Sequence, residues 1–451
     1  GTVSGTSNVT VSGTTVSGAG TIAMTGGTFT LSNGGTFGGN RDWSFNNLTF
    51  GNGTLATTTK TGSSTVTVGS ILTDAANQTF EAGTSTTWVL TGGGTPLALS
   101  GAFSVQNATF RYAGTGATNV TPATYAQLDF GANGVSSPVY TLLSGTFNVG
   151  GAWNVGVVAT NTVTVNANTN DPALTLSGNM NVVASSTFVL SNTGSLTARR
   201  NWTNLGTTTA SGGTVTFDAT TTGFTITPGA SPFANVLFNN SNGGWTVTGN
   251  ATATGNFTLS ALASFTLSPN ATLEVDGVFT NGVGGGATTW TNSTLYLNAN
   301  AIETINTKTT GADIYGTLTT GGTTQVRVWN SSAATTTTNN SSSVYSMNHA
   351  NVSGALNIWG TYNHSSGTDY WDYATDFDGV SIASTSRVVN VRVASSSTLN
   401  FSGGQLEVLG ASGATTTIDT QSTGGYSWNI TGGVLNMQYY KIRGIDQNGL
   451  S

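Results

Sequence analysis

The chain has 451 residues, a formal net charge of −6 and only 6% charged residues, whereas ordinary globular proteins have about 25%. The eleven Lys and Arg residues are scattered, which argues against nucleic-acid binding, and no apolar run of about 18 residues is present to span a membrane as a helix. Because 37% of the residues are hydrophobic, with ten Trp, twelve Tyr and nineteen Phe, the chain is too apolar for a disordered coil.

Short alternations of apolar and polar residues run along the whole chain, and good helix formers are scarce. Examples are Thr65–Val68, Phe257–Leu259 and Val389–Val393. Clusters of Gly, Asn, Ser and Asp separate them, which is typical of short strands joined by tight turns. The sequence therefore predicts an all-β protein.

Residues 1–40 are of low complexity. Val-Ser-Gly occurs at 3–5, 11–13 and 16–18, and Thr28–Leu31 follows as a predicted strand. The chain begins and ends within such patterns, so we expect it to be a portion of a longer protein.

Residues 41–320 contain long-range repeats. Nine positions recur at one constant offset with residues of the same kind: Gly178, Met180, Phe188, Leu190, Ser191, Leu196, Trp202, Thr203 and Asn204 match Gly255, Phe257, Phe265, Leu267, Ser268, Leu273, Phe279, Thr280 and Asn281. We call this pair of segments the long repeat. A second, larger offset relates Tyr125–Phe130 to Phe233–Phe238. Such self-similarity is typical of repeat architectures.

Two architectures fit these repeats: a parallel, right-handed β-solenoid (β-helix) with turns of roughly 20–25 residues, and a string of immunoglobulin-like β-sandwiches of about 100 residues each. Within the long repeat, Phe257–Leu259, Phe265–Leu267 and Leu273–Val275 are very short and evenly spaced. Strands this short are expected where a chain turns corners around a narrow core. We therefore predict the β-solenoid and retain tandem sandwiches as the alternative.

Residues 321–451 are richer in aromatic and acidic residues, and we expect a continuation of the solenoid with longer loops. Four carboxylates lie close together in the sequence, at Asp369, Asp372, Asp376 and Asp378. Carboxylate oxygens are ligands for Ca²⁺, and Tyr370, Trp371 and Tyr373 could stack on sugar rings. Three interpretations stay open for this segment: an ordered surface loop, a calcium site and a glycan contact.

No catalytic residues are predicted. The two histidines, His349 and His364, lie in Asn- and Ser-rich stretches without a nucleophile motif. Asn168–Asp171 is similar to the Asn-Thr-Asp element of polygalacturonases, but the other elements of that family are missing. We therefore expect no enzyme activity and no cofactor other than Ca²⁺.

Elements such as Trp202–Asn204 and Phe279–Asn281, together with Gly-Thr-apolar-Thr segments, resemble the repeat regions of autotransporter passengers and filamentous-haemagglutinin-like adhesins. This resemblance implies an extracellular, non-enzymatic structural or adhesive protein in a bacterial surface fibre, filament or coat. Separately, the exposed edges of a solenoid and the low charge of the chain suggest self-association, end-to-end or lateral, or continuation within a longer chain. The aromatic residues near position 370 make surface glycans candidate partners. The alternative is a glycan-binding or polysaccharide-processing β-helix.

Overall fold

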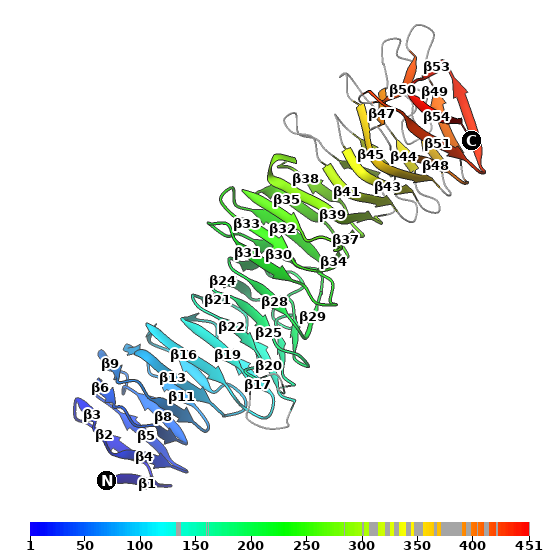
Figure 1. Cartoon of the computed structure of the whole chain (residues 1–451). Coiled ribbons are helices and arrows are strands. Elements are labelled where there is room, and N and C mark those ends of the chain that lie inside the picture. Colours follow the sequence, from blue (N-terminus) through cyan, green and yellow to red (C-terminus); the bar gives the residue numbers. More distant parts are fainter. Residues whose placement is uncertain are drawn as a thin grey trace. The chain divides into compact units, whose positions relative to one another are not determined.

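The computed structural model describes most of the chain up to residue 299 and a series of strands after it. The described residues are 1–131, 137–158, 160, 162–283, 285–299, 302–305, 314–320, 325–328, 333–339, 344–346, 355–364, 368–370, 390–393, 398–403, 405–409, 415–420 and 423–450. Almost all regular structure in these residues is parallel β-strand, which winds through the successive turns of a β-solenoid (Figure 1). The predicted all-β solenoid is confirmed, and tandem sandwiches are wrong.

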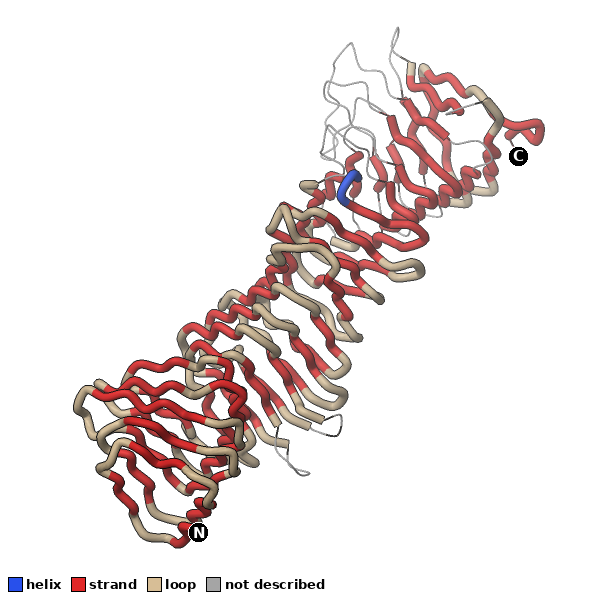
Figure 2. Tube along the Cα trace, turned by 60° about the vertical axis from the view of Figure 1, so that its left-hand side comes forward, coloured by secondary structure: helices blue, strands red, loops and turns tan. Residues whose placement is uncertain are grey.

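The chain forms two compact units, Gly1–Thr216 and Phe217–Ser451. Strand β30 (Thr214–Phe217) contains the boundary between them. The only described helix is a single 3-10 turn, Gly285–Ala287, which is the blue segment in Figure 2. No helix in the described residues has the length and apolar character needed to cross a membrane.

In the first unit each turn contributes three strands, one to each of three faces. The first face contains β1 (Thr2–Gly5), β4 (Thr21–Met24), β7 (Trp43–Phe45), β10 (Thr65–Val68), β13 (Thr84–Leu90), β16 (Asn107–Tyr112), β19 (Gln127–Phe130), β22 (Trp153–Val155), β25 (Met180–Val182) and β28 (Trp202–Asn204). All of these strands pair in parallel with their neighbours on the face.

The other two faces of the first unit follow the same order. The second contains β2 (Val9–Val11), β5 (Thr28–Leu31), β8 (Asn47–Phe50), β11 (Leu72–Asp74), β14 (Leu97–Leu99), β17 (Thr118–Val120), β20 (Val139–Leu142), β23 (Thr164–Asn166), β26 (Thr187–Val189) and β29 (Thr207–Thr209). The third contains β3 (Thr15–Ser17), β6 (Gly35–Gly38), β9 (Ala56–Thr61), β12 (Gln78–Glu81), β15 (Ala102–Ser104), β18 (Thr124–Tyr125), β21 (Thr146–Val149), β24 (Ala173–Leu176) and β27 (Leu196–Ala198). The length of a turn varies along the first face, from the short turn that pairs Thr109 with Gln127 to the long turn that pairs Trp153 with Met180.

The core of the first unit is built from rows of inward side chains that repeat from turn to turn. One such row on the first face is fully buried and consists of Trp43, Val66, Trp88, Phe110, Leu128, Trp153, Met180 and Trp202. The rings of Trp88 and Phe110 stack at 6.0 Å between centroids, with 12° between their planes. Because strands alternate, the residues between these positions point outward, and many are Thr, Ser or Asn.

The second unit begins with the same three-strand turn. Its strands on the three faces are β31 (Phe224–Thr227), β33 (Gly244–Val247) and β36 (Ser264–Leu267); β34 (Ala251–Ala253) and β37 (Thr272–Val275); and β32 (Asn235–Asn239), β35 (Phe257–Ala261) and β38 (Phe279–Asn281). Phe238 and Trp245 pack at 6.3 Å in its core.

From β39 (Thr288–Leu297) onward, one long strand serves two faces, because β39 pairs with both β36 and β37. The long strands continue as β41 (Ile314–Thr320), β43 (Ala333–Asn339) and β45 (Ala355–His364), and they divide into β47 (Asn390–Val393), β50 (Thr416–Thr420) and β53 (Tyr440–Ile442) and into β48 (Thr398–Phe401), β51 (Tyr426–Ile430) and β54 (Ile445–Leu450). The remaining face contains β40 (Ile302–Ile305), β42 (Gln325–Val328), β44 (Val344–Ser346), β46 (Thr368–Tyr370), β49 (Gln405–Leu409) and β52 (Val434–Gln438).

The long repeat corresponds to one stacked turn in each unit. In the first copy, Met180 pairs with Trp202 on the next turn; in the second, Phe257 pairs with Phe279. The three short segments that start at Phe257 lie on three successive strands, β35, β36 and β37. The repeat therefore recurs because each copy forms the same succession of short strands and corners around a narrow core.

Candidate functional site

The regular strand pairing between turns is interrupted on two of the three faces of the first unit. Strands β14 and β15 pair only with the turn before them, and β17 and β18 form strand pairings only with the turn after them. All residues of these strands and their connections are described, and only the first face crosses the interruption with paired strands, through β13, β16 and β19. We call this region, residues 94–125, the ladder break.

A shift of register accompanies the ladder break. Thr118 of β17 forms a bridge with Gly94, which precedes the start of β14 at Leu97. The amide of Asn119 donates to the carbonyl of Gly94 at 2.5 Å, and the hydroxyl of Thr121 donates to the carbonyl of Leu97. The turn that crosses the break, from Thr109 to its paired residue Gln127, is also the shortest paired turn on the first face of this unit. The shortened turn and the slipped pairing leave β15 and β18 without a pairing between them.

Three buried tyrosines bond to backbone groups at the ladder break. The Tyr140 hydroxyl donates to the carbonyl of Gly114 at 2.9 Å, and the Tyr125 hydroxyl donates to the carbonyl of Thr121 at 2.6 Å. The Tyr112 hydroxyl accepts the amide of Thr121 at 3.3 Å and lies 3.2 Å from the Tyr125 hydroxyl. Burial raises the pKa of Tyr112 to about 12 and the pKa of Tyr125 well above its usual value. The side chains thus satisfy buried backbone groups that regular pairing would otherwise satisfy.

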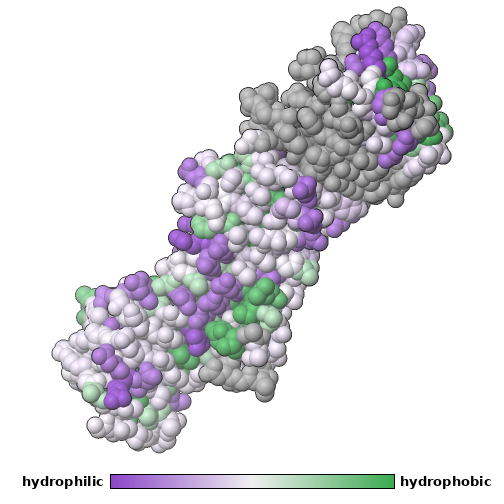
Figure 3. Space-filling model, in the orientation of Figure 1, coloured by the Kyte–Doolittle hydropathy of each residue, from purple (hydrophilic) through white to green (hydrophobic). Residues whose placement is uncertain are grey.

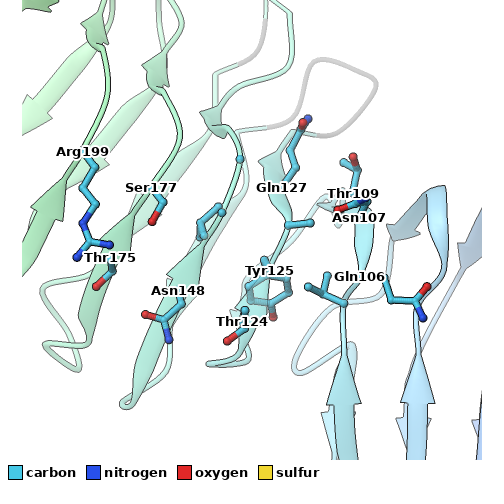
Figure 4. A pocket seen from close by; sticks show the side chains of 15 residues that line it. Gln106, Asn107, Thr109, Thr124, Tyr125, Gln127, Asn148, Thr175, Ser177 and Arg199 are labelled. Atoms are coloured by element: carbon cyan, nitrogen blue, oxygen red, sulfur yellow. The ribbon is translucent and has the colours of Figure 1, made fainter. Parts of the chain in front are cut away.

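A groove of about 710 Å³ opens beside the ladder break, at the corner between the third and first faces. Its lining comes from five successive turns, and Figure 4 shows the polar side chains from Gln106 at one end to Arg199 at the other. The lining residues are Val105, Gln106, Asn107, Thr109, Thr124, Tyr125, Ala126, Gln127, Asn148, Val149, Gly150, Gly151, Thr175, Ser177 and Arg199.

Two glycines keep the corner of the groove open. A Cβ atom on Gly151 would lie 2.6 Å from the carbonyl oxygen of Ala126, so only glycine fits there. Beside the glycines, Thr124, Asn148 and Thr175 lie in register on β18, β21 and β24. Successive side chains in this row are therefore separated by one strand spacing, roughly 4.8 Å.

The lining of the groove is almost uncharged and combines polar side chains with apolar surface. Arg199 is the only charged residue of its lining, which contains no Asp, Glu, His or Cys. Amide and hydroxyl side chains such as those of Asn107, Gln127, Asn148 and Ser177 both donate and accept hydrogen bonds. The arrangement is suited to binding a ligand with many hydroxyl groups, and it lacks the carboxylates of an acid–base pair.

A row of polar residues on the first face adjoins the groove. Asn181 donates to Asn154 and Asn154 donates to Asp129, both at 2.8 Å, while Gln127 donates to Asp129 at 3.1 Å. Arg111 forms an ion pair with Asp129 at 3.4 Å. These bonds hold Gln127, at the edge of the groove, in a fixed orientation.

Two ionisable side chains are buried in the core, and burial shifts the pKa of each. Asp74 is fully buried, and its carboxylate faces the backbone of Gly101 without a well-aligned hydrogen bond. Burial raises its pKa to about 7, which the Gly101 amide offsets only in part. Lys60 is also buried; its ammonium group donates to Thr61, Gly62 and Ser64, and burial lowers its pKa to about 8.

The acidic and aromatic candidates from the sequence fall almost entirely outside the described residues. Asp369 and Tyr370 lie on β46, where the structure describes the backbone. Trp371, Asp372, Tyr373, Asp376 and Asp378 lie outside the described residues, as does His349. Among the described side chains, no group of three or more His, Cys, Asp or Glu could hold a metal ion. The calcium and glycan interpretations of this segment stay predictions.

Asp171, from the polygalacturonase-like element, has a carboxylate that is hydrogen-bonded to the following turn of the first unit. Its carboxylate accepts hydrogen bonds from the Ser191 hydroxyl at 2.6 Å, the Asn192 amide at 2.7 Å and the hydroxyl and amide of Thr193 at 2.9 and 3.2 Å. These donors lower its pKa to about 2. Asp171 thus joins one turn to the next.

Sequence reasoning did not find the groove. Most of its residues are Thr, Asn, Gln, Ser and Gly, which occur throughout the chain, so their types carry no signal. The adjacent Gly150 and Gly151, followed by Trp153, mark a corner, but similar pairs occur elsewhere. Comparison of the chain with family models, curated proteins and solved structures finds no match.

Proposed function

We propose that this chain is a non-enzymatic structural or adhesive part of a bacterial surface fibre, filament or coat, outside the cell. The observation that carries the proposal is the repeated inward row of the first unit, from Trp43 to Trp202, beneath parallel strands that pair turn after turn. Such a structure provides length and a regular surface from a short repeating pattern.

The surface composition supports the same proposal. On the face in Figure 3, much of the described surface is pale, with separate hydrophilic patches and a distinct hydrophobic patch between them. Outward positions of the first face include Thr67, Thr109 and Thr203. Hydroxyl groups keep such a surface hydrated with little charge, so that copies packed side by side would experience little electrostatic repulsion.

Self-association, or continuation within a longer chain, is part of this proposal. A parallel ladder bonds through its main chain, so any further turn of similar shape adds to it with the same hydrogen bonds. In a surface fibre, this bonding would transmit load along the stack.

Immunogold electron microscopy of intact source cells tests the proposal. Antibodies raised against the purified chain should label filaments or a coat at the surface of unpermeabilised cells. Label confined to the cytoplasm of permeabilised cells would contradict an extracellular role. Negative-stain images of the purified chain then show whether it forms fibres by itself.

One observation favours the glycan-binding alternative, namely the groove between Gln106 and Arg199, whose lining is rich in amide and hydroxyl side chains. Polysaccharide processing by a glycosidase would require two carboxylates on either side of the scissile bond. The lining of this groove contains none. Binding is therefore the part of the alternative that the groove supports.

A further inference from the structure

We infer that the groove beside the ladder break binds an extended oligosaccharide that lies along the stacking direction of the turns. This inference goes beyond a structural role, because it assigns a ligand class to a defined surface of the first unit. It concerns residues 105–199 and does not involve the acidic segment near residue 370.

The chemistry of the lining favours a ligand rich in hydroxyl groups. Many lining side chains both donate and accept hydrogen bonds, namely those of Gln106, Asn107, Gln127 and Asn148 and the hydroxyls of threonine and serine. The hydroxyl groups of a sugar likewise donate and accept. A ligand of this kind can satisfy the lining without bringing a charge into the groove.

The row of Thr124, Asn148 and Thr175 has a geometry that suits an extended ligand. These residues are in register on three successive turns, so a ligand along the corner meets a new polar side chain roughly every 4.8 Å. An extended polymer with hydroxyl groups at every unit matches such a repeated row, whereas a small compact ligand would use only part of it.

Other ligand classes fit this lining less well. A nucleic acid requires several Lys or Arg residues along its phosphates, and the groove has only Arg199. A peptide docked through its side chains commonly uses aromatic walls, and the one aromatic residue of the lining, Tyr125, is fully buried. A metal ion such as Ca²⁺ requires several oxygen ligands, commonly carboxylates, which the lining lacks.

The groove is also held rigidly, which reduces the entropy lost on binding. Tyr125 fixes the corner through its bond to the Thr121 carbonyl at 2.6 Å. Its ring packs on Phe110 at 5.6 Å between centroids. Asp129 holds Gln127 from the adjoining face.

Isothermal titration calorimetry of the full chain tests the inference with two uncharged probes, cellohexaose and chitohexaose. We expect at least one of them to bind the parent chain. The Gly150→Phe substitution should plug the groove and weaken that binding at least tenfold. A Cβ at Gly150 meets only the carbonyls of Tyr125 and Ala126, at 3.8 and 3.9 Å, so the backbone accepts the change. Gly249→Phe is the matched control, because a Cβ there meets nothing within 4 Å and the site is far from the groove in sequence.

A second pair of variants tests the hydrogen bonding and does not depend on the plug. Asn148 is an exposed strand residue in the groove. Asn148→Leu keeps a side chain of similar size but removes its hydrogen-bonding groups, so it should weaken binding several-fold. Asn239→Leu makes the same change on β32 of the second unit and should leave binding unchanged. Circular dichroism and thermal unfolding confirm that each variant is folded. The inference is overturned if no probe binds the parent, or if binding is equal in the parent and Gly150→Phe; neither result affects the localisation test of the surface fibre.

Discussion

Asp74 makes the stability of the first unit depend on pH in a direction opposite to that of a salt-bridged carboxylate. Its side chain is fully buried, and its pKa rises from 3.8 to about 7 because of that burial. Well below pH 3.8 the carboxyl is protonated in both the folded and the unfolded chain, so it contributes no pH-dependent penalty. As pH rises from 4 to 7, the unfolded chain loses this proton first, and the folded state is destabilised.

The magnitude follows from the shift. Three pKa units correspond to about 4 kcal/mol, and partial access of water to the charged form reduces the cost. We expect about 2 kcal/mol above pH 7. Asp74→Asn removes the charge at nearly constant volume, so the variant should match the parent near pH 4 and exceed its free energy of unfolding by about 2 kcal/mol at pH 9.

Guanidinium unfolding of the full chain, followed by tryptophan fluorescence at pH 4 and pH 9, measures this difference. Asp42→Asn is the control, because Asp42 is exposed and its substitution removes the same charge. The free energy of unfolding of the parent is subtracted from that of the variant at each pH, and the two differences are compared. This removes the effect of the other carboxylates, which titrate in both chains. If that difference is the same at pH 4 and pH 9, Asp74 is not desolvated and the reasoning fails.

Three other substitutions test the hydrogen bonds and backbone positions described above. Tyr140→Phe should leave the buried carbonyl of Gly114 unpaired and cost about 1–3 kcal/mol; faster amide exchange around the ladder break checks it, and unchanged exchange refutes it. Gly35→Ala should destabilise the N-terminal turns much more than Gly53→Ala in thermal unfolding, because both have positive φ but only Gly35 faces a neighbouring carbonyl; equal effects would mean that the close contact is unimportant. Asp171→Ala should increase amide hydrogen exchange in the turn that Asp171 joins to the next. In the parent, amide exchange there should increase only as pH falls from about 4 towards 2, because the carboxylate of Asp171 becomes protonated in that range. Amide exchange that responds neither to the substitution nor to the fall in pH would contradict this role.

The fold could be predicted from sequence because a narrow solenoid places the same demand on every turn. Short alternations such as Thr65–Val68 and Phe265–Leu267 became β10 and β36, and the copies of the long repeat each stack one turn on the next. The average length of a turn was also predictable, since the short strands are evenly spaced and three strands complete a turn.

The ladder break and its groove could not be predicted in this way. They depend on the short turn between Thr109 and Gln127 and on the slip that pairs Thr118 with Gly94, ahead of the start of β14. Neither event changes the apolar–polar alternation, because Phe110 and Leu128 continue the inward row across the break. The tyrosines that replace backbone partners there have the pattern of ordinary core residues in the sequence. The residues of this groove are common types, and only the register in which successive turns pair brings them together. That register cannot be read from the residue types.

The inward row from Trp43 to Trp202 also affects how the number of turns can change during evolution. Its positions are occupied by Trp, Phe, Leu, Val or Met, so no turn requires one particular neighbour. Unequal recombination that gains or drops a whole turn would leave the residues on either side with an acceptable new contact. Natural relatives are therefore expected to vary in size by steps of one turn, while most single insertions of a few residues are confined to the corners.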